Sequence, residues 1–108
     1  MINLKISVSF VANICTAENG HEAVVQILKA EKENDGFDLV LMDMQMPIMD
    51  GYQATRLLRQ RGFSRPIIAI TAHNLIGDRE KCLAAGCSDY LAKPVELSIF
   101  YKKINAYL

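Results

Sequence analysis

The stretch FDLVLMDMQMPIMDGYQATRLLR, residues 37–59, decides the fold of this chain. Residues 37–42 form a short apolar run broken by one aspartate, which is typical of a strand buried on both faces of a sheet. An Asp-Gly pair at 50–51 then begins an amphipathic helix that extends to about residue 60. A buried strand, a short loop and an amphipathic helix in this order predict an α/β fold with parallel strands.

The same alternation continues on both sides of this stretch. Gly86 marks the end of one helix, because glycine is favoured just after a helix C-terminus. The pattern predicts strands at residues 13–17, 66–71 and 88–92, and helices at 21–32, 78–85 and 95–108. We expect one α/β domain over residues 1–108, with parallel strands and helices on both faces of the sheet.

Composition excludes several classes of function. Lysine plus arginine and aspartate plus glutamate are balanced at twelve each, so no net charge attracts nucleic acid or an anionic membrane. The apolar runs are too short to cross a membrane, and no signal peptide is recognisable, so we expect a cytoplasmic chain. Cys15, Cys82 and Cys87 are odd in number and lack a metal-binding spacing, which indicates small buried side chains.

Polar residues stand where three predicted strands end. Asp43 ends the first strong strand, Thr71 ends the next, and Lys93 follows the third. Taken singly, each has an ordinary explanation as a turn former, a strand end or a solvated charge. Together, at the carboxyl edge of a parallel sheet, they are expected to converge where ligands bind. A carboxylate can accept a phosphoryl group, and a hydroxyl and an ammonium can bind its oxygens.

These motifs resemble one known family. Residues 37–59 resemble the phosphoacceptor region of response-regulator receiver domains, particularly those of hybrid sensor histidine kinases. PIIAITAHNLIGDREKCLAAGCSDYLAKP (66–94) and TAENGHEAVVQIL (16–28) extend the resemblance to about residues 14–108. It implies a flavodoxin-like three-layer sandwich and a role in two-component phosphorelay signalling. Such a module is no classical enzyme; it receives a phosphoryl group from a histidine kinase or phosphotransfer protein and switches an interaction surface.

The resemblance implies a role for each residue near the strand ends. Asp43 would be the phosphoacceptor, Thr71 the switch hydroxyl, and Lys93 the lysine beside the phosphoryl group. Ala72 would leave space for the phosphoryl group, and Tyr90 would be the aromatic switch. The output surface would be formed by the helices at 78–85 and 95–108, on either side of Tyr90.

Metal binding and loop shape are also implied by the resemblance. The metal would be Mg²⁺, held by Asp43 and the main-chain carbonyl of Gln45. Pro47 and Gly51 would shape the loop after the acceptor, and Lys93-Pro94 is similar to the family's cis-peptide site.

The N-terminus departs from the family pattern. Family members begin with a central strand that ends in two adjacent acidic residues, but no acidic residue precedes Glu18 here. We therefore expect the first strand and half of the first helix to be absent. Residues 1–13 fit two patterns: Ile2, Ile6 and Phe10 form a helical stripe, whereas the alternation from Leu4 to Phe10 favours a strand. Both alternatives stay open.

The missing acidic pair has chemical consequences. Mg²⁺ prefers six oxygen ligands, so we expect weak or absent metal binding and slow or absent phosphorylation of Asp43. Glu18 and Asp50 could in principle replace the missing acidic pair as metal ligands, but neither is favoured. Loss of a central strand would expose two sheet edges, so a homodimer could form there or on the final-helix face.

Two other hypotheses concern function. The chain could be an interaction module that works without phosphorylation. A flavodoxin-like enzyme is disfavoured because no phosphate-binding glycine loop follows a strand. His21 and His73 lack metal-ligand spacing and a phosphodonor context, and the methionines at 42–49 are better explained as packing residues than as copper ligands.

Overall fold

The computed structural model describes residues 14–15, 19–72 and 77–108. Strands and helices alternate as the sequence predicts, with end points that differ by a few residues. They are β1 (Ile14–Cys15), α1 (Gly20–Lys32), β2 (Leu39–Asp43), α2 (Gly51–Gln60), β3 (Ile67–Thr71), α3 (Asp78–Ala85), β4 (Asp89–Ala92) and α4 (Leu97–Tyr107).

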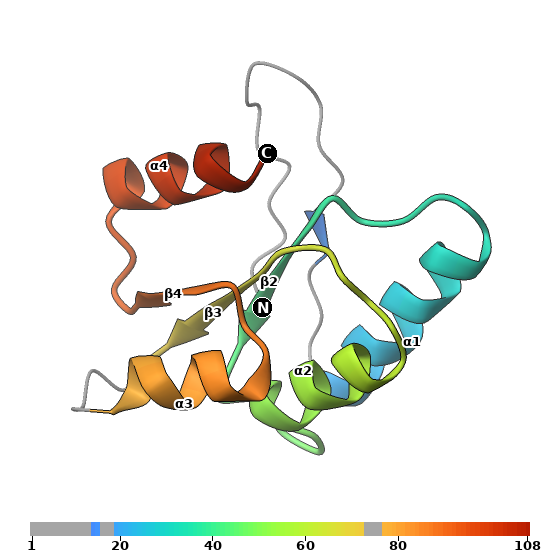
Figure 1. Cartoon of the computed structure of the whole chain (residues 1–108). Coiled ribbons are helices and arrows are strands. Elements are labelled where there is room, and N and C mark those ends of the chain that lie inside the picture. Colours follow the sequence, from blue (N-terminus) through green and yellow to red (C-terminus); the bar gives the residue numbers. More distant parts are fainter. Residues whose placement is uncertain (1–13, 16–18, 73–76) are drawn as a thin grey trace.

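The described strands form one parallel four-stranded sheet in the order β1-β2-β3-β4 (Figure 1). Asp43 in β2 is paired with Ile70 in β3, and Thr71 in β3 is paired with Ala92 in β4. The register therefore brings the carboxyl ends of the three longer strands to the same edge of the sheet.

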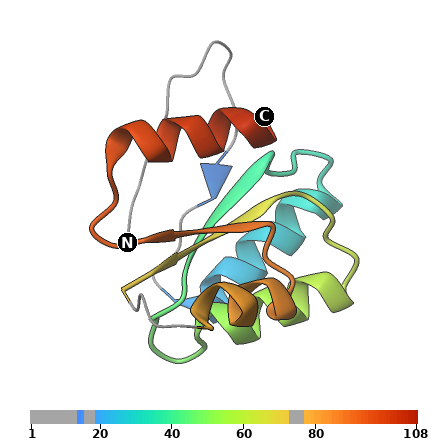
Figure 2. The ribbon, with the colours of Figure 1, turned by 60° about the vertical axis from the view of Figure 1, so that its left-hand side comes forward.

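Helices cover both faces of this sheet, as expected for a three-layer sandwich. Helices α1, α2 and α3 lie on one face, and α4 lies on the other (Figures 1 and 2). The side chains of β2 alternate between the two faces of the sheet. Val40 and Met42 pack with the three-helix layer, whereas Leu39 and Leu41 pack with α4. The methionines of residues 42–49 all belong to the three-helix core or pack against it.

One expectation about the sheet is wrong. Removal of a central first strand was expected to leave two open strand edges, but β1 pairs directly with β2. Ile14 is in register with Leu39, and Cys15 with Val40. Backbone pairing thus continues from β1 across the sheet to β4. The two alternatives for residues 1–13 concern a segment outside the described residues.

Short polar residues and glycine set the helix ends. The side chain of Asn19 accepts a hydrogen bond of 2.8 Å from the backbone N–H of Glu22 and so caps α1. Asp50 caps α2 in a reciprocal pair with Gln53, so its carboxylate is engaged at the start of this helix. Gly86 ends α3 in the left-handed conformation at φ 114°, as the sequence predicts.

All three cysteines are buried free thiols, as expected from the sequence. Burial raises the pKa of the Cys15 thiol to about 12, and burial raises that of Cys87 to about 11. Since the thiolate is the reactive form, these side chains serve as packing groups.

The guanidinium of Arg59 joins the end of α2 to the chain before β3 and to the end of α3. Its Nε donates to the carbonyl of Gly86 at 2.9 Å, and its Nη1 donates to the carbonyls of Phe63 and Arg65 at 2.7 and 2.9 Å. The guanidinium also lies 5.8 Å from the ring centroid of Phe63. One side chain therefore supplies donors to three loop carbonyls.

Replacing Arg59 with methionine keeps much of the apolar stem and removes all of these donors. We expect the free energy of unfolding to fall by about 1–3 kcal/mol, because carbonyls lose a charged hydrogen-bond partner. Urea denaturation measures the change, with Arg56→Met as the control because Arg56 is exposed on the same helix. Equal stability of Arg59→Met and wild type would contradict this role.

Lys103 of α4 reaches across the edge strand β4. Its Nζ lies 2.9 Å from Asp89 Oδ1 and donates to the carbonyl of Tyr90 at 2.8 Å. Tyr107 also donates its hydroxyl to Asp89 Oδ2 at 3.3 Å. Burial alone would raise the pKa of Asp89, but hydrogen bonds from Lys103 and the Tyr90 N–H outweigh burial and lower it.

The lowered pKa of Asp89 predicts a pH-dependent contribution to stability. A carboxylate with a depressed folded pKa stabilises fully above its unfolded pKa, near 3.9, and loses this effect as the pH falls through the folded value. Asp89→Asn should therefore cost about 1–3 kcal/mol at neutral pH, and its difference from wild type should shrink below about pH 4. Thermal unfolding as a function of pH tests this, with the exposed Asp35→Asn as control. A difference independent of pH would be evidence against it.

Among the described residues, no helix has the length and apolar character needed to cross a membrane.

Candidate functional site

The acceptor candidate, Asp43, lies at the carboxyl end of β2 and forms an ion pair with Lys93. Lys93 Nζ is 2.8 Å from Asp43 Oδ2, and the two side chains keep 36% and 29% of their surface exposed. Lys93 is positioned by its own backbone, since its N–H donates to the carbonyl of Thr71 at 2.8 Å. The Lys93-Pro94 peptide bond is cis, as the resemblance implied. The pair is open to an incoming group from solvent.

Thr71 and Ala72 lie at the neighbouring strand end and are both contacted by Gln45. Thr71 is fully buried at the end of β3. Gln45 Nε2 donates to Thr71 Oγ1 at 3.1 Å, and the Ala72 N–H donates to Gln45 Oε1 at 2.8 Å. The backbone N–H of Gln45 also donates to Asp43 Oδ1 at 2.9 Å. Residues from β2, β3 and the end of β4 thus surround one small region.

Sequence reasoning assigned a role only to the main-chain carbonyl of Gln45 and missed its carboxamide. A usable signal was present in the sequence: a long amide side chain stands two residues after a strand-end aspartate. Its reach to the next strand depends on strand spacing, which no residue pattern states.

The loop between β2 and α2 is held by close backbone contacts. Gly51 N–H donates to the carbonyl of Met44 at 3.3 Å, and Gly20 N–H donates to the carbonyl of Met49 at 2.8 Å. A Cβ atom on Gly20 would lie 2.3 Å from the Met49 oxygen, so α1 begins in direct contact with this loop. Pro47 and the exposed Ile48, at φ 69°, form the turn at the outer end of the loop.

Tyr90 lies on β4 at the boundary between the two helical layers. Its ring packs against the three-helix core, and Lys103 Nζ of α4 lies 5.4 Å from the ring centroid. Tyr90 is therefore linked to α4 by the same lysine that binds its carbonyl. Nearby, α4 carries the exposed apolar side chains Leu97, Ile99 and Tyr101.

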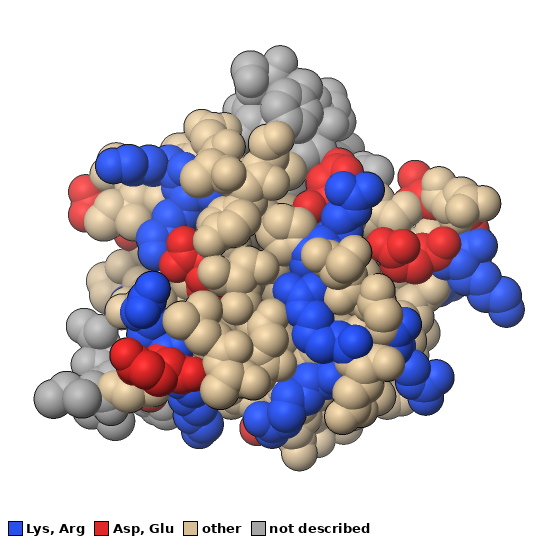
Figure 3. Space-filling model, in the orientation of Figure 1, with Lys and Arg blue, Asp and Glu red and all other residues tan. Residues whose placement is uncertain are grey.

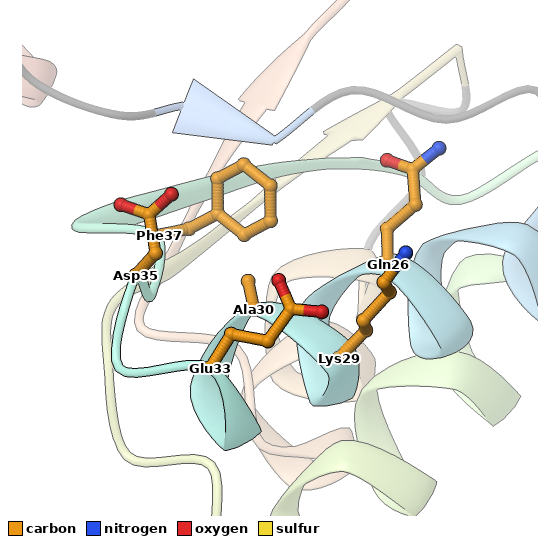
Figure 4. A pocket seen from close by; sticks show the side chains of 6 residues that line it. All are labelled: Gln26, Lys29, Ala30, Glu33, Asp35 and Phe37. Atoms are coloured by element: carbon orange, nitrogen blue, oxygen red, sulfur yellow. The ribbon is translucent and has the colours of Figure 1, made fainter.

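A hollow of about 430 Å³ lies at the other end of β2, away from Asp43 (Figure 4). The ring of Phe37 and the carboxamide of Gln26 flank it, and Lys29 of α1 and Glu33, the residue after α1, bring opposite charges to its wall. Ligands in open parallel sheets bind at the carboxyl ends of the strands, and this hollow lies at the amino end of β2. It is not the candidate site.

The surface charge does not single out a nucleic-acid site either. On the face shown in Figure 3, acidic and basic side chains are interspersed, with basic side chains gathered over the region of α2. The formal net charge of the whole chain at pH 7 is zero.

Comparison with known proteins shows the family of this chain. Residues 3–105 match the response regulator receiver domain. The chain belongs to the receiver-domain family. It is therefore a receiver domain of two-component phosphorelay signalling, and such domains act as phosphoacceptor modules for histidine kinases or phosphotransfer proteins.

The similar proteins include receivers of hybrid kinases. The chain is 47% identical over 88 residues to the signal transduction histidine-protein kinase BarA of Shigella flexneri. The aligned region covers 80% of this chain and 9% of that protein. It is 44% identical over 94 residues to hybrid signal transduction histidine kinase G of Dictyostelium discoideum, covering 84% of this chain and 3% of the relative. The chain thus spans a small part of these relatives.

Solved receiver structures show the same fold. The receiver domain of a Pseudomonas aeruginosa sensor histidine kinase is 41% identical, with a TM-score of 0.70 over 84% of this chain and 72% of that one. That structure has a magnesium ion coordinated in its active-site cleft. A response regulator from Chloroflexus aurantiacus is 31% identical, with a TM-score of 0.74 over 84% and 72% of the two chains.

The described residues of this receiver domain do not by themselves fit a Mg²⁺ site. Among residues 14–15, 19–72 and 77–108, no three acidic, histidine or cysteine side chains gather as a metal-binding group. Asp43 is engaged by Lys93 and by the Gln45 N–H, and Asp50 caps α2. The Asp43 carboxylate and one carbonyl supply too few oxygen ligands for an octahedral ion. Glu18, the other acidic residue near this site in sequence, lies outside the described residues.

Gly51 couples the start of α2 to the acceptor. An added Cβ would lie 2.6 Å from the Asp43 carbonyl oxygen and 2.5 Å from Met44 Cε. Gly51→Ala should therefore lower the free energy of unfolding by about 1–3 kcal/mol and shift the backbone amide resonances of residues 43–45. Urea denaturation and two-dimensional NMR measure both effects, with Ala84→Ser on the exposed face of α3 as control. Unchanged resonances near Asp43 would contradict the coupling.

Proposed function

We propose that Asp43 accepts a phosphoryl group from a phosphohistidine of a histidine kinase or phosphotransfer protein. The observation that carries this proposal is the Asp43–Lys93 pair, 2.8 Å apart and partly exposed, at the carboxyl edge of a receiver-family sheet. Membership of the family supplies the reaction class, and the position of Asp43 at the end of β2 supports its choice as the acceptor.

In the proposed transfer, a carboxylate oxygen of Asp43 attacks the phosphorus atom. The P–O bond to the aspartate forms as the P–N bond to the donor imidazole breaks, and the electron pair of that bond returns to the imidazole nitrogen. Lys93 stabilises the negative oxygens of the transferred group, because its ammonium already lies against the acceptor carboxylate. The Thr71 hydroxyl and the Ala72 N–H are the other donors at this edge.

The proposed output is a change at β4 and α4. When Thr71 turns toward the phosphoryl group, the adjacent strand end and the ring of Tyr90 adjust their packing. Tyr90 is bound to α4 through Lys103, so the change reaches the exposed apolar side chains of that helix. This face is the proposed binding surface for a partner or for a second copy of the chain.

We also propose that phosphorylation is slow and that Mg²⁺ binds weakly to the described residues. Two oxygen ligands leave most of the metal's coordination to water, and the ammonium of Lys93 competes for the Asp43 carboxylate. The free buried thiols favour the reducing cytoplasm as the place of this exchange.

Phosphoryl transfer is tested with acetyl phosphate and with a phosphorylated histidine phosphotransfer protein, both in the presence of Mg²⁺. Intact-mass measurement should show one phosphoryl adduct on the wild type and none on Asp43→Asn. The matched control is Asp35→Asn, since Asp35 is exposed and precedes the other end of β2. An adduct on Asp43→Asn, or no adduct on wild type from either donor, would reject Asp43 as the acceptor.

A further inference from the structure

The geometry points to a second role for Gln45: we infer that its carboxamide is an internal ligand that occupies the phosphoryl-binding groups until Asp43 is modified. The inference rests on the proposed function, because it concerns the same site. It starts from the two hydrogen bonds that Gln45 makes across the sheet edge.

The carboxamide contacts two polar groups of the neighbouring strand end. Its Oε1 accepts the Ala72 N–H at 2.8 Å, and its Nε2 donates to Thr71 Oγ1 at 3.1 Å. Both groups lie at the same sheet edge as Asp43, because Asp43 is paired with Ile70 and Gln45 binds Asp43 Oδ1 through its backbone N–H. A carboxamide presents an oxygen acceptor and an N–H donor together, so it can bind an amide and a hydroxyl at once.

A phosphoryl group cannot share the Ala72 N–H with Gln45, because this N–H has a single proton to donate. Its oxygens are acceptors only, so they need the Ala72 N–H and the Thr71 hydroxyl as donors. In the present structure Ala72 donates to Gln45, and Thr71 Oγ1 accepts from Gln45. The Thr71 hydroxyl can accept from Gln45 Nε2 and still donate its own proton, but the Ala72 N–H reaches a phosphoryl oxygen only after Gln45 Oε1 has left it.

The position of Gln45 permits such an exchange. Its backbone N–H is bound to Asp43 Oδ1 at 2.9 Å, so the residue stays next to the acceptor. Its side chain is exposed, so the carboxamide can turn into water without disturbing the core. Because an exposed amide regains hydrogen bonds from water, its release costs only the net strength of two hydrogen bonds.

Two variants separate the hydrogen bonds from the bulk of the side chain. Gln45→Ala removes both, whereas Gln45→Met keeps a similar length and removes only the hydrogen bonds. Gln60→Ala is the control, because Gln60 is exposed at the end of α2, away from this edge. Beryllofluoride, which forms a tetrahedral adduct with carboxylates, is the probe in the presence of Mg²⁺.

The contact itself is measured by NMR without any phosphoryl group. The Ala72 amide proton should exchange faster with solvent in Gln45→Ala and Gln45→Met than in wild type and Gln60→Ala. In the titration, both Gln45 variants should bind beryllofluoride roughly 5-fold more tightly, since Gln45 Oε1 no longer competes for the Ala72 N–H with a net hydrogen bond of ordinary strength. A purely structural role for Gln45 would not increase this affinity.

The outcomes distinguish the inference from the proposed function. An unchanged Ala72 amide, or beryllofluoride binding to the Gln45 variants that is equal to or weaker than that to wild type, would overturn the inference while Asp43 remains the acceptor. Absence of binding to every variant, with no transfer from acetyl phosphate, would reject the proposed function and the competition together.

Discussion

The parallel pairing of β2 with β3 is the interaction on which the rest of the structure depends. Residues Val40–Asp43 are in register with Ile67–Ile70, and both strands are buried between helical layers. Because the strands are parallel, their carboxyl ends meet at one edge, and Asp43 and Thr71 become neighbours. The same pairing continues to β4, whose chain then places Lys93 beside the carboxylate. A slip of one residue in this register would turn the buried side chains to the opposite layer and separate the polar groups.

Backbone contacts between layers hold the loop after the acceptor. Gly20 at the start of α1 and Gly51 at the start of α2 both approach loop carbonyls too closely for a side chain. Helix packing on the three-helix face therefore determines where the loop runs, and the loop determines where Gln45 stands relative to Asp43. The polar site is thus a consequence of tight backbone contacts several residues away.

The same sheet edge both provides binding groups and occupies them. Lys93 neutralises Asp43, while Gln45 binds Thr71 and Ala72, so the donors and the acceptor have internal partners. Such partners are compatible with a receiver domain, because the pair and the carboxamide are partly open to solvent and can exchange. An incoming phosphoryl group must compete with interactions of ordinary strength, each worth about 1 kcal/mol in net terms. Few metal ligands are found among the described residues. The internal partners therefore reduce the affinity for a phosphoryl group more than they would in a site with a complete metal coordination shell.

Local patterns in the sequence determined the alternation of strands and helices, the glycine end of α3, the burial of the cysteines and the placement of Asp43 and Thr71 at strand ends. These follow from periodicity, capping chemistry and the common direction of parallel strands, which neighbouring residues express. The direct pairing of β1 with β2, the three carbonyl contacts of Arg59 and the Gln45 carboxamide bridge were decided by the tertiary structure alone. Backbone pairing leaves no residue signature, and the reach of a side chain depends on distances between segments far apart in the chain.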